Sequence, residues 1–431
     1  WGLKCVDKFR GMFAFAIWDN IKKKVFLVRD RVGVKPLYFK FNSEKLIFSS
    51  EIKAILLDPD YIPEIDEESM YHYLTFICTP APKTMFKNIN KLEAGTWISF
   101  DEKGKIEKKK YWDPLQDKEL TDIKNINKVI ARTLEESIKY RGISDVDVGV
   151  FLSGGIDSAI IIHSLAELGK KVPTYTIGFK DASSYYNETD SARKIANYYG
   201  FKNETIFLDT KNVFSSMNDI LSSNDEPFAD SSSIPMYMIS KVAGKNVKVA
   251  LTGDGGDELF GGYRKYMAYK WTKILKIIPS YVRKNLVNYL PDDKNYKLSN
   301  QLRKFKRLLE NYDDDLEKMQ INFLDQLDGN EFFYLFGFRK SNLSKKIFLS
   351  ANIFDGDLNY ILARDFNFSL LGDMLVKLDR HSMANSLEVR SPFLDKDLVD
   401  YSFNIPSEKK IGFFKGKKIL RHAYKNSIPN W

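Results

Sequence analysis

The chain has 431 residues, of which 44% are hydrophobic and 29% charged, and its formal net charge at pH 7 is +9. This composition excludes a disordered chain, and the length allows two or three domains with sizeable cores. The positive charge comes from scattered lysines that are not interleaved with aromatic residues, which favours a solvated surface over a nucleic-acid groove.

Residues 1–112 are predicted to form a β-rich unit, because short β-branched and aromatic runs alternate there with charged or glycine-containing turns. The expected strands are residues 11–18, 24–28, 36–40, 45–49 and 96–100. The polar stretch 113–126 is predicted to be a linker to a second unit, residues 127–431.

Strands and helices are expected to alternate in this second unit. The pattern predicts helices at residues 126–140, from 158 onward and at 191–199, and strands at 146–152, 173–179, 204–208 and 247–251. Such alternation predicts an α/β fold in which helices cover both faces of a parallel sheet and ligands bind at the carboxyl ends of the strands. After about residue 260 the chain is expected to be mostly helical through residue 400.

The most informative stretch is residues 146–158, VDVGVFLSGGIDS, in which an apolar strand leads into a Gly-Gly turn and a helix. The N-terminus of a helix attracts anions, and glycines let a phosphate approach the backbone. Ser153 and Ser158 add hydroxyl donors, and Asp157 offers a hard oxygen to Mg²⁺. No Gly-Lys-Ser/Thr follows, so this is not a Walker loop. We predict a site for the pyrophosphate end of ATP, and an ordinary strand-to-helix turn is the alternative.

Two further groups of charged residues follow. Asp254 and Asp257, in TGDGGDELFGGY, directly follow the fourth strand and are expected at the same edge of the sheet, although such turns are often simple loops. The second group of charged residues comprises Asp379, Arg380, Glu388 and Arg390. It belongs either to the site or to a buried ion-pair network.

One lysine near the C-terminus is a further candidate. Lys417 would stabilise charge on a departing pyrophosphate, and an ordinary surface lysine is the default alternative.

In this order the motifs resemble the glutamine-dependent asparagine synthetase family over nearly the whole chain. The segments that carry the resemblance are residues 11–19, 29–38, 50–54, 153–158, 225–237, 252–263, 379–395 and the stretch around Lys417. The resemblance implies the latter half of an Ntn-type αββα glutaminase domain of class II. It further implies that a PP-loop ATP pyrophosphatase domain follows, with a parallel sheet of the adenine nucleotide alpha hydrolase type.

The resemblance also implies an activity with aspartate, ATP and glutamine-derived ammonia as substrates. The β-carboxylate of aspartate attacks the α-phosphorus of ATP, giving β-aspartyl-AMP and pyrophosphate, and ammonia then displaces AMP. Asp254 would assist intermediate formation and accept a proton from ammonia, Lys417 would neutralise the phosphates, and Asp157 and Asp257 would hold Mg²⁺. The implied ATP-binding residues are Leu152, Ser153, Gly154, Gly155, Ile156, Asp157, Ser158, Ile177, Thr252 and Gly253. The family resemblance is also compatible with a homodimer.

The chain departs from this family at both ends. The family's glutaminase nucleophile is an N-terminal cysteine, whereas this chain begins at Trp1, inside that domain, and Cys5 has neither the position nor the context of a nucleophile. We therefore expect a chain that lacks the catalytic part of the glutaminase, does not hydrolyse glutamine, is incomplete at its C-terminus and exposes sheet edges.

Other functions remain open. A family relative could amidate another carboxylate, on a sugar precursor or a peptide. A tRNA-modifying PP-loop enzyme would be expected to carry an RNA-binding appendage or cysteines in its ATP domain, but Cys5 and Cys78 both lie outside it. A binding protein without catalysis would be expected to lose the acidic and glycine positions.

The cysteines and the hydropathy pattern bear on location. Two cysteines are too few for a disulfide framework and have no zinc-like spacing with the four histidines. No apolar run approaches the about 18–20 residues of a membrane span, and no signal peptide precedes Trp1. We expect a cytoplasmic protein with no membrane or nucleic-acid partner.

Overall fold

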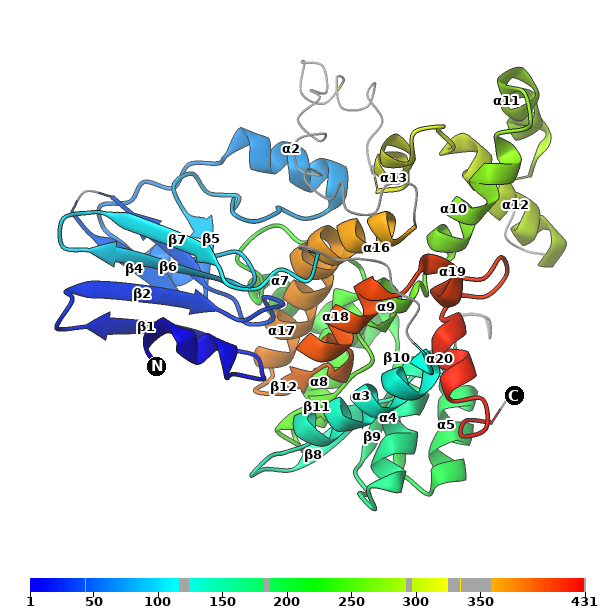
Figure 1. Cartoon of the computed structure of the whole chain (residues 1–431), viewed down its shortest axis with the longest axis horizontal. Coiled ribbons are helices and arrows are strands. Elements are labelled where there is room, and N and C mark those ends of the chain that lie inside the picture. The colour runs from blue at the N-terminus through cyan, green and yellow to red at the C-terminus, as the bar shows by residue number, and fades with distance from the viewer. Residues whose placement is uncertain are drawn as a thin grey trace.

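The computed structural model describes residues 1–42, 44–115, 124–180, 187–291, 297–324, 334 and 358–429. Two units lie side by side, an antiparallel β unit formed by the N-terminal residues and a larger α/β unit formed by the rest (Figure 1). The predicted fold class is therefore confirmed. Residues 116–123, most of the predicted linker, lie outside the described ranges, and the domain boundary stays a prediction.

The N-terminal unit contains two antiparallel sheets, with strand orders β1-β2-β6-β7 and β4-β3-β5. Its elements are the 3₁₀ helix η1 (Gly2–Asp7), β1 (Ala14–Asp19), β2 (Lys24–Arg29), β3 (Tyr38–Phe41), β4 (Leu46–Ser49), α1 (Ile52–Ile55), α2 (Glu67–Phe76), β5 (Asn90–Lys91), β6 (Thr96–Asp101) and β7 (Ile106–Lys110). The five predicted strands are present, although several begin later than predicted. The two-residue β5, the fully exposed β7 and the helices were missed.

Strands β1 and β7 form the two edges of the four-stranded sheet, as expected for this unit. In β7 every residue is exposed and three successive lysines, residues 108–110, face water, a composition that discourages pairing with another strand. In β1, Ile17 and Trp18 are half exposed. Leu27, Ile98 and Phe100 belong to the apolar cluster at the centre of this unit.

The α/β unit is built on a parallel sheet of order β10-β9-β8-β11-β12. Its first part comprises α3 (Ile126–Arg141), β8 (Val148–Phe151), α4 (Ile156–Glu167), β9 (Thr174–Phe179), α5 (Thr189–Tyr199), β10 (Asn203–Leu208), α6 (Thr210–Ser215), α7 (Met217–Ser222), α8 (Ser233–Ala243) and β11 (Val249–Leu251). All four predicted strands and the predicted helices are confirmed in this part.

The second part is largely helical, as predicted, with one exception. It comprises α9 (Gly256–Phe260), α10 (Arg264–Leu275), α11 (Ser280–Tyr289), α12 (Lys297–Glu310), α13 (Leu316–Leu324), α16 (Asn359–Asp365), the π-helix η4 (Phe366–Met374), α17 (Leu375–Met383), β12 (Glu388–Arg390), the 3₁₀ helix η5 (Pro392–Leu394), α18 (Lys396–Asn404), α19 (Ser407–Lys410) and α20 (Lys418–Ala423). The fifth strand, β12, was missed because three residues give no readable period.

The direction of each crossover places the helices around the sheet. The chain moves from β8 through α4 and α5 toward β10, and then back through α8 and α17 toward β12. Because such crossovers are right-handed, α4 and α5 cover one face and α8 and α17 the other (Figure 1). The carboxyl ends of β8 and β11, which are neighbours, therefore meet where the winding direction reverses, the usual ligand position in such a sheet.

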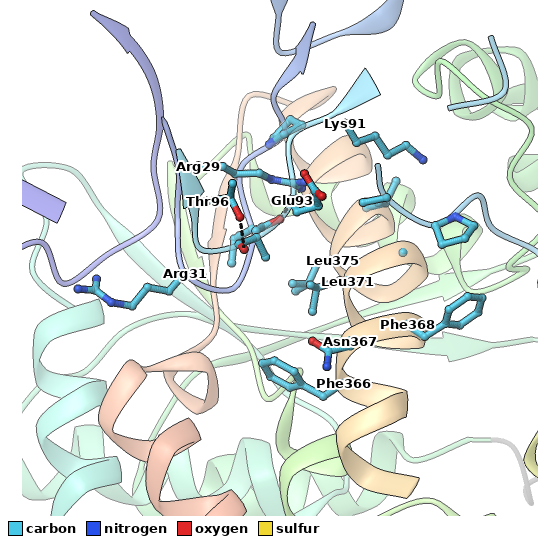
Figure 2. Close-up of a pocket in the computed structure, with 18 of the residues that line it drawn as sticks. Arg29, Arg31, Lys91, Glu93, Thr96, Phe366, Asn367, Phe368, Leu371 and Leu375 are labelled. Carbon is cyan, nitrogen blue, oxygen red and sulfur yellow. Dashed lines mark hydrogen bonds between the residues drawn. The ribbon is translucent and has the colours of Figure 1, made fainter. Parts of the chain in front are cut away.

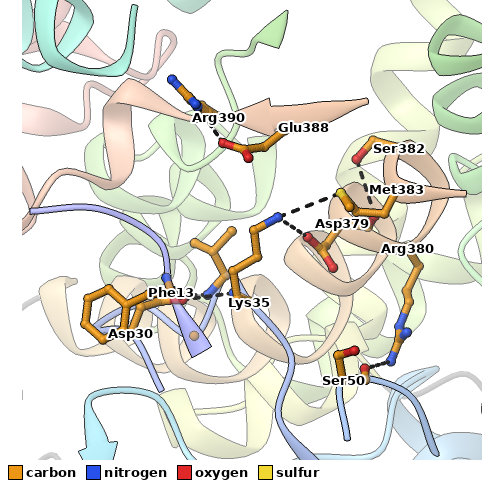
Figure 3. Close-up of polar contacts among 12 residues, drawn as sticks. Phe13, Asp30, Lys35, Ser50, Asp379, Arg380, Ser382, Met383, Glu388 and Arg390 are labelled. Atoms are coloured by element: carbon orange, nitrogen blue, oxygen red, sulfur yellow. Dashed lines mark hydrogen bonds and ion pairs between the residues drawn. The ribbon is translucent and has the colours of Figure 1, made fainter. Parts of the chain in front are cut away.

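Ion pairs join the two units (Figure 3). Lys35 Nζ contacts Asp379 at 2.8 Å, and Arg380 donates to the Ser50 carbonyl at 2.8 Å and contacts Asp225 at 2.9 Å. Of the four charged residues whose role the sequence left open, Asp379 and Arg380 thus lie at the boundary between the units.

The other two residues of that group pair with each other. Arg390 Nε lies 2.6 Å from Glu388 Oε1, and the Arg390 guanidinium also donates to the Arg141 carbonyl at 3.0 Å. That carbonyl is at the C-terminus of α3, where a cation is favoured by the helix dipole.

Arg10 makes a bidentate contact across the boundary. Its guanidinium donates twice to the Asp395 carboxylate, at 2.8 and 2.9 Å, and Asp395 is fully buried. Asp395 also caps α18 by accepting from the Asp397 N–H at 3.1 Å. Its charge is compensated largely by one arginine from the other unit.

Within the described part of the chain, no helix is both long enough and apolar enough to cross a membrane.

Replacement of Arg10 by methionine is expected to lower the free energy of unfolding by about 2 kcal/mol, because it leaves the buried Asp395 carboxylate uncompensated. Urea denaturation of the purified chain measures this loss. The matched control is Asp397→Asn, which removes the more exposed carboxylate that Arg10 contacts at 3.2 Å and should cost less than about 0.5 kcal/mol. Equal losses in the two variants would contradict the assignment.

Candidate active site

The turn between β8 and α4 has the form of an anion site. The Ser158 hydroxyl accepts from the Ser153 N–H at 3.1 Å and donates back toward the Ser153 carbonyl at 3.0 Å, which closes the turn. Among the described residues no side chain caps the N-terminus of α4, so the N–H groups of its first turn remain available. Leu152 and Ile156, two of the residues predicted to bind ATP, flank this turn.

One N–H of the turn is used by a residue that the sequence did not indicate. The Gly154 N–H donates to the Glu188 carboxylate at 3.1 Å. A Cβ atom on Gly154 would lie 2.8 Å from the Ser191 side chain and 3.2 Å from that of Glu188. The neighbouring Gly155 N–H donates to the Ser153 hydroxyl at 3.1 Å.

Lys417 lies between two of the predicted metal ligands. Its ammonium contacts Asp157 Oδ2 at very short range and Asp257 Oδ1 at 2.9 Å. Asp157 and Lys417 are 8% and 9% exposed, so this contact is shielded from water. The structure therefore brings together three predicted residues from the β8–α4 turn, the helix after β11 and the start of α20.

Burial and charge act in opposite directions on this group. Burial raises the pKa of Asp157, although the neighbouring Lys417 ammonium lowers it. Burial alone would lower the pKa of Lys417, but the carboxylates of Asp157 and Asp257 outweigh it and raise that pKa. The group thus consists of two acidic side chains and one lysine that stabilises both of them.

Glycines let these side chains approach the backbone. A Cβ atom at Gly253 or Gly256 would lie 2.8 Å from the side chain of Asp157, and one at Gly262 would overlap Asp257 Oδ1 and Lys417 Cε. The segment after β11 must therefore be rich in glycine to make room for the carboxylates. The sequence indicated this segment only as a turn.

The remaining predicted residues lie around this centre. The Thr252 hydroxyl donates to Asp254 Oδ2 at 2.6 Å, and the Ser391 hydroxyl donates to the Asp254 carbonyl. Asp254 is only partly buried. Ile177 lies on β9, one residue after Thr176, whose hydroxyl donates to the Leu152 carbonyl at 2.8 Å.

A buried acid next to this group was not singled out from the sequence. Burial raises the pKa of Glu258 to about 7, and its carboxylate accepts from the Tyr263 hydroxyl at 2.7 Å. Both residues belong to segment 252–263, which the sequence analysis singled out, but the sequence does not show that Tyr263 donates to Glu258.

The Asp157 and Asp257 carboxylates have the chemistry of Mg²⁺ ligands. Asp157 Oδ1 is buried and has no hydrogen-bond partner among the residues that the structure describes. In the described residues no group of three or more His, Cys, Asp and Glu could hold a metal. Mg²⁺ commonly takes only one or two protein carboxylates and completes its shell with water and substrate phosphates, so Asp157 and Asp257 suffice.

A separate cavity lies at the boundary between the units (Figure 2). It measures about 540 Å³ and is lined by both units, including Arg29, Lys91, Phe366 and Leu371. Its cations already have partners: Arg29 donates to three carbonyls and Lys91 contacts Glu226 at 2.7 Å. None of the predicted ATP or metal residues lines it.

Substitution of Gly262 by alanine is expected to destabilise the fold by about 1–3 kcal/mol, because the added methyl displaces Asp257 and Lys417. Urea denaturation provides the measurement. Gly11→Ala is the control, since a Cβ at Gly11 meets no atom within 4 Å. Matching midpoints for the two variants would show that the packing around Lys417 is looser than described.

Comparison with known proteins adds independent information. The family model described as asparagine synthase matches residues 129–430, and the model described as a glutamine amidotransferase domain matches residues 1–112. Asparagine synthetase (glutamine-hydrolyzing) 1 of Bacillus subtilis is 32% identical over 433 residues, which cover 99% of this chain and 67% of that protein.

Two other relatives show how wide the similarity is. The putative asparagine synthetase (glutamine-hydrolyzing) 2 of Methanocaldococcus jannaschii is 34% identical over 287 residues, covering 65% of this chain and 55% of that protein. Amidase chyE of Penicillium rubens is 25% identical over 489 residues, covering 100% of this chain and 69% of that protein. The chain thus spans between about half and about two thirds of the length of these relatives. The family match over most of the chain, together with the identity to the Bacillus subtilis relative, shows that the chain belongs to the asparagine synthase family.

Proposed function

We propose that the chain carries the synthetase activity of an AMP-forming amide ligase that converts aspartate to asparagine, with nitrogen from glutamine in the intact protein. The observation that carries this proposal is the placement of Lys417 between Asp157 and Asp257, beside the uncapped turn that precedes α4. Membership of the asparagine synthase family implies the use of ATP. The amidotransferase match at residues 1–112 supports glutamine as the nitrogen source.

The nucleotide is proposed to lie across the ends of β8 and β11. The N–H groups and hydroxyls of residues 153–158 would bind the pyrophosphate part, and the backbone at Leu152, Thr252 and Gly253, with Ile177, would contact the adenosine. Asp157 and Asp257 would hold Mg²⁺, which neutralises phosphate charge when bound.

The chemistry begins with activation of the acceptor. A carboxylate is a poor electrophile without a leaving group, and attack of its oxygen on the α-phosphorus supplies AMP as the leaving group. Lys417 is proposed to neutralise charge on the pyrophosphate that departs. Asp254, whose carboxylate is only partly buried, is proposed to assist intermediate formation and to accept a proton from the attacking ammonia.

A second candidate is amidation of a different carboxylate. The similarity to amidase chyE over the whole chain supports it, since that relative is not described as an asparagine synthetase. Incubation with ATP, Mg²⁺ and ammonia separates the candidates. The first predicts that AMP, pyrophosphate and asparagine form only when aspartate is present, and pyrophosphate release that does not depend on aspartate would rule it out.

Asp157→Asn is expected to lower Mg²⁺- and ATP-dependent pyrophosphate release by at least about 100-fold while leaving the protein folded, because a neutral amide is a poor ligand for Mg²⁺. A coupled pyrophosphate assay and circular dichroism measure the two properties. Asp147→Asn, an exposed substitution of the same kind near the start of β8, serves as the control and should retain activity. Full activity in Asp157→Asn would refute the metal assignment.

Asp254→Ala is expected to slow asparagine formation by about 10- to 100-fold, since it removes a proton acceptor next to the acyl intermediate. Separate measurement of pyrophosphate release and of asparagine formation shows which half-reaction is affected. If neither rate changes, Asp254 has no part in the reaction.

A further inference from the structure

Lys417 already occupies the position between the carboxylates in which a divalent ion would be bound. Its ammonium bridges Asp157 Oδ2 and Asp257 Oδ1, which come from two different turns. Two carboxylates and one ammonium leave one excess negative charge, and Asp157 Oδ1 has no partner. The group is thus stabilised by an internal cation but is not fully neutralised by it.

The backbone around Lys417 is closely packed. A Cβ atom on Gly416 would overlap the Gly261 carbonyl and lie 3.1 Å from the Gly262 Cα, so these two chain segments are in direct contact. Lys417 itself has a φ of +54° at the N-cap of α20. The flexible four-carbon side chain of Lys417 allows a change of partner by rotation, without movement of the main chain.

In the turn proposed to bind pyrophosphate, a side chain of the protein likewise occupies a position proposed for a ligand. The Glu188 carboxylate accepts from the Gly154 N–H, in the turn proposed to bind pyrophosphate. An internal anion and an internal cation therefore each occupy a position that suits one part of a metal–nucleotide complex.

We propose that Lys417 is a resident cation: without nucleotide its ammonium holds the Asp157 and Asp257 carboxylates together in place of a divalent ion, and it transfers to a phosphate oxygen when the metal–nucleotide complex binds. This inference rests on the proposed function, because it takes phosphate as the second partner of Lys417. Its consequence is an obligatory order. A divalent ion alone is excluded, since displacing the ammonium before phosphate is present would leave a buried charge without a partner.

Binding of Mn²⁺ alone, followed by electron paramagnetic resonance, tests the proposal without any turnover. The wild-type chain should bind Mn²⁺ at least about tenfold more weakly than Lys417→Met. The double variant Lys417→Met/Asp257→Asn should lose the gained affinity, which would place the ion at this carboxylate pair. Lys418→Met is the matched control, because it removes an exposed lysine next in sequence and should leave Mn²⁺ binding unchanged.

Thermal unfolding gives a second readout. Mn²⁺ should raise the unfolding temperature of Lys417→Met and leave that of the wild type unchanged. If Lys417→Met does not fold by circular dichroism, Lys417→Gln takes its place, as it also removes the charge but keeps a polar group. Equal Mn²⁺ affinity of wild type and variant, in the absence of nucleotide, would overturn the proposal.

Failure of this proposal is distinguishable from failure of the proposed function. Equal Mn²⁺ binding by the wild type and Lys417→Met, together with aspartate-dependent pyrophosphate release by the wild type, would refute the resident-cation proposal and leave the proposed ligase function standing. A gain of Mn²⁺ binding in Lys417→Met, without aspartate-dependent pyrophosphate release by the wild type, would support the resident cation and refute the proposed ligase activity.

Discussion

The candidate site depends on one buried ammonium placed between two carboxylates. Lys417, Asp157 and Asp257 come from three separate segments, and each charge is tolerable at this depth only because the others are present. The same contact sets the packing of its surroundings. Gly253 and Gly256 lie against Asp157, and a side chain at either position would displace the carboxylate from the end of the sheet. The glycine-rich segment is therefore a consequence of the charges it surrounds.

The charges at the domain boundary have a different role, but they are linked to the site through α17 and β12. Asp379 and Arg380 lie on α17 and pair with residues of the N-terminal unit and with Asp225. The chain then enters β12, whose last residue, Arg390, accepts from the Thr252 N–H through its carbonyl at 3.0 Å. The next residue, Ser391, donates to the Asp254 carbonyl. One continuous segment thus fixes the N-terminal unit at one end and the β11 turn at the other.

Much of the fold could be predicted from the sequence, and the reasons for the misses are physical. Strands β8, β9, β10 and β11 and helices α3, α4 and α5 have a clear apolar period, whereas β12 is too short to have one and the exposed β7 does not alternate. Asp157, Asp257 and Lys417 were predicted to share one site, and the structure brings them together. Their mutual contact was not predictable, because the sequence does not show which charges meet when no ligand is present. For the same reason the contact of Glu188 with the turn was missed, and the partners of Asp379 and Arg380 were visible only once both units were in place.

The candidate site and the boundary cavity differ in how their charged groups are partnered. In the boundary cavity of about 540 Å³, lining cations such as Arg29 already donate hydrogen bonds to backbone carbonyls. At the carboxylate pair, by contrast, the flexible side chain of Lys417 supplies the cation that contacts Asp157 and Asp257. Well-packed apolar residues would stabilise such a position at least as well as this group of charges does. The proposed exchange of these charges with those of a ligand accounts for their place at the carboxyl ends of two adjacent parallel strands.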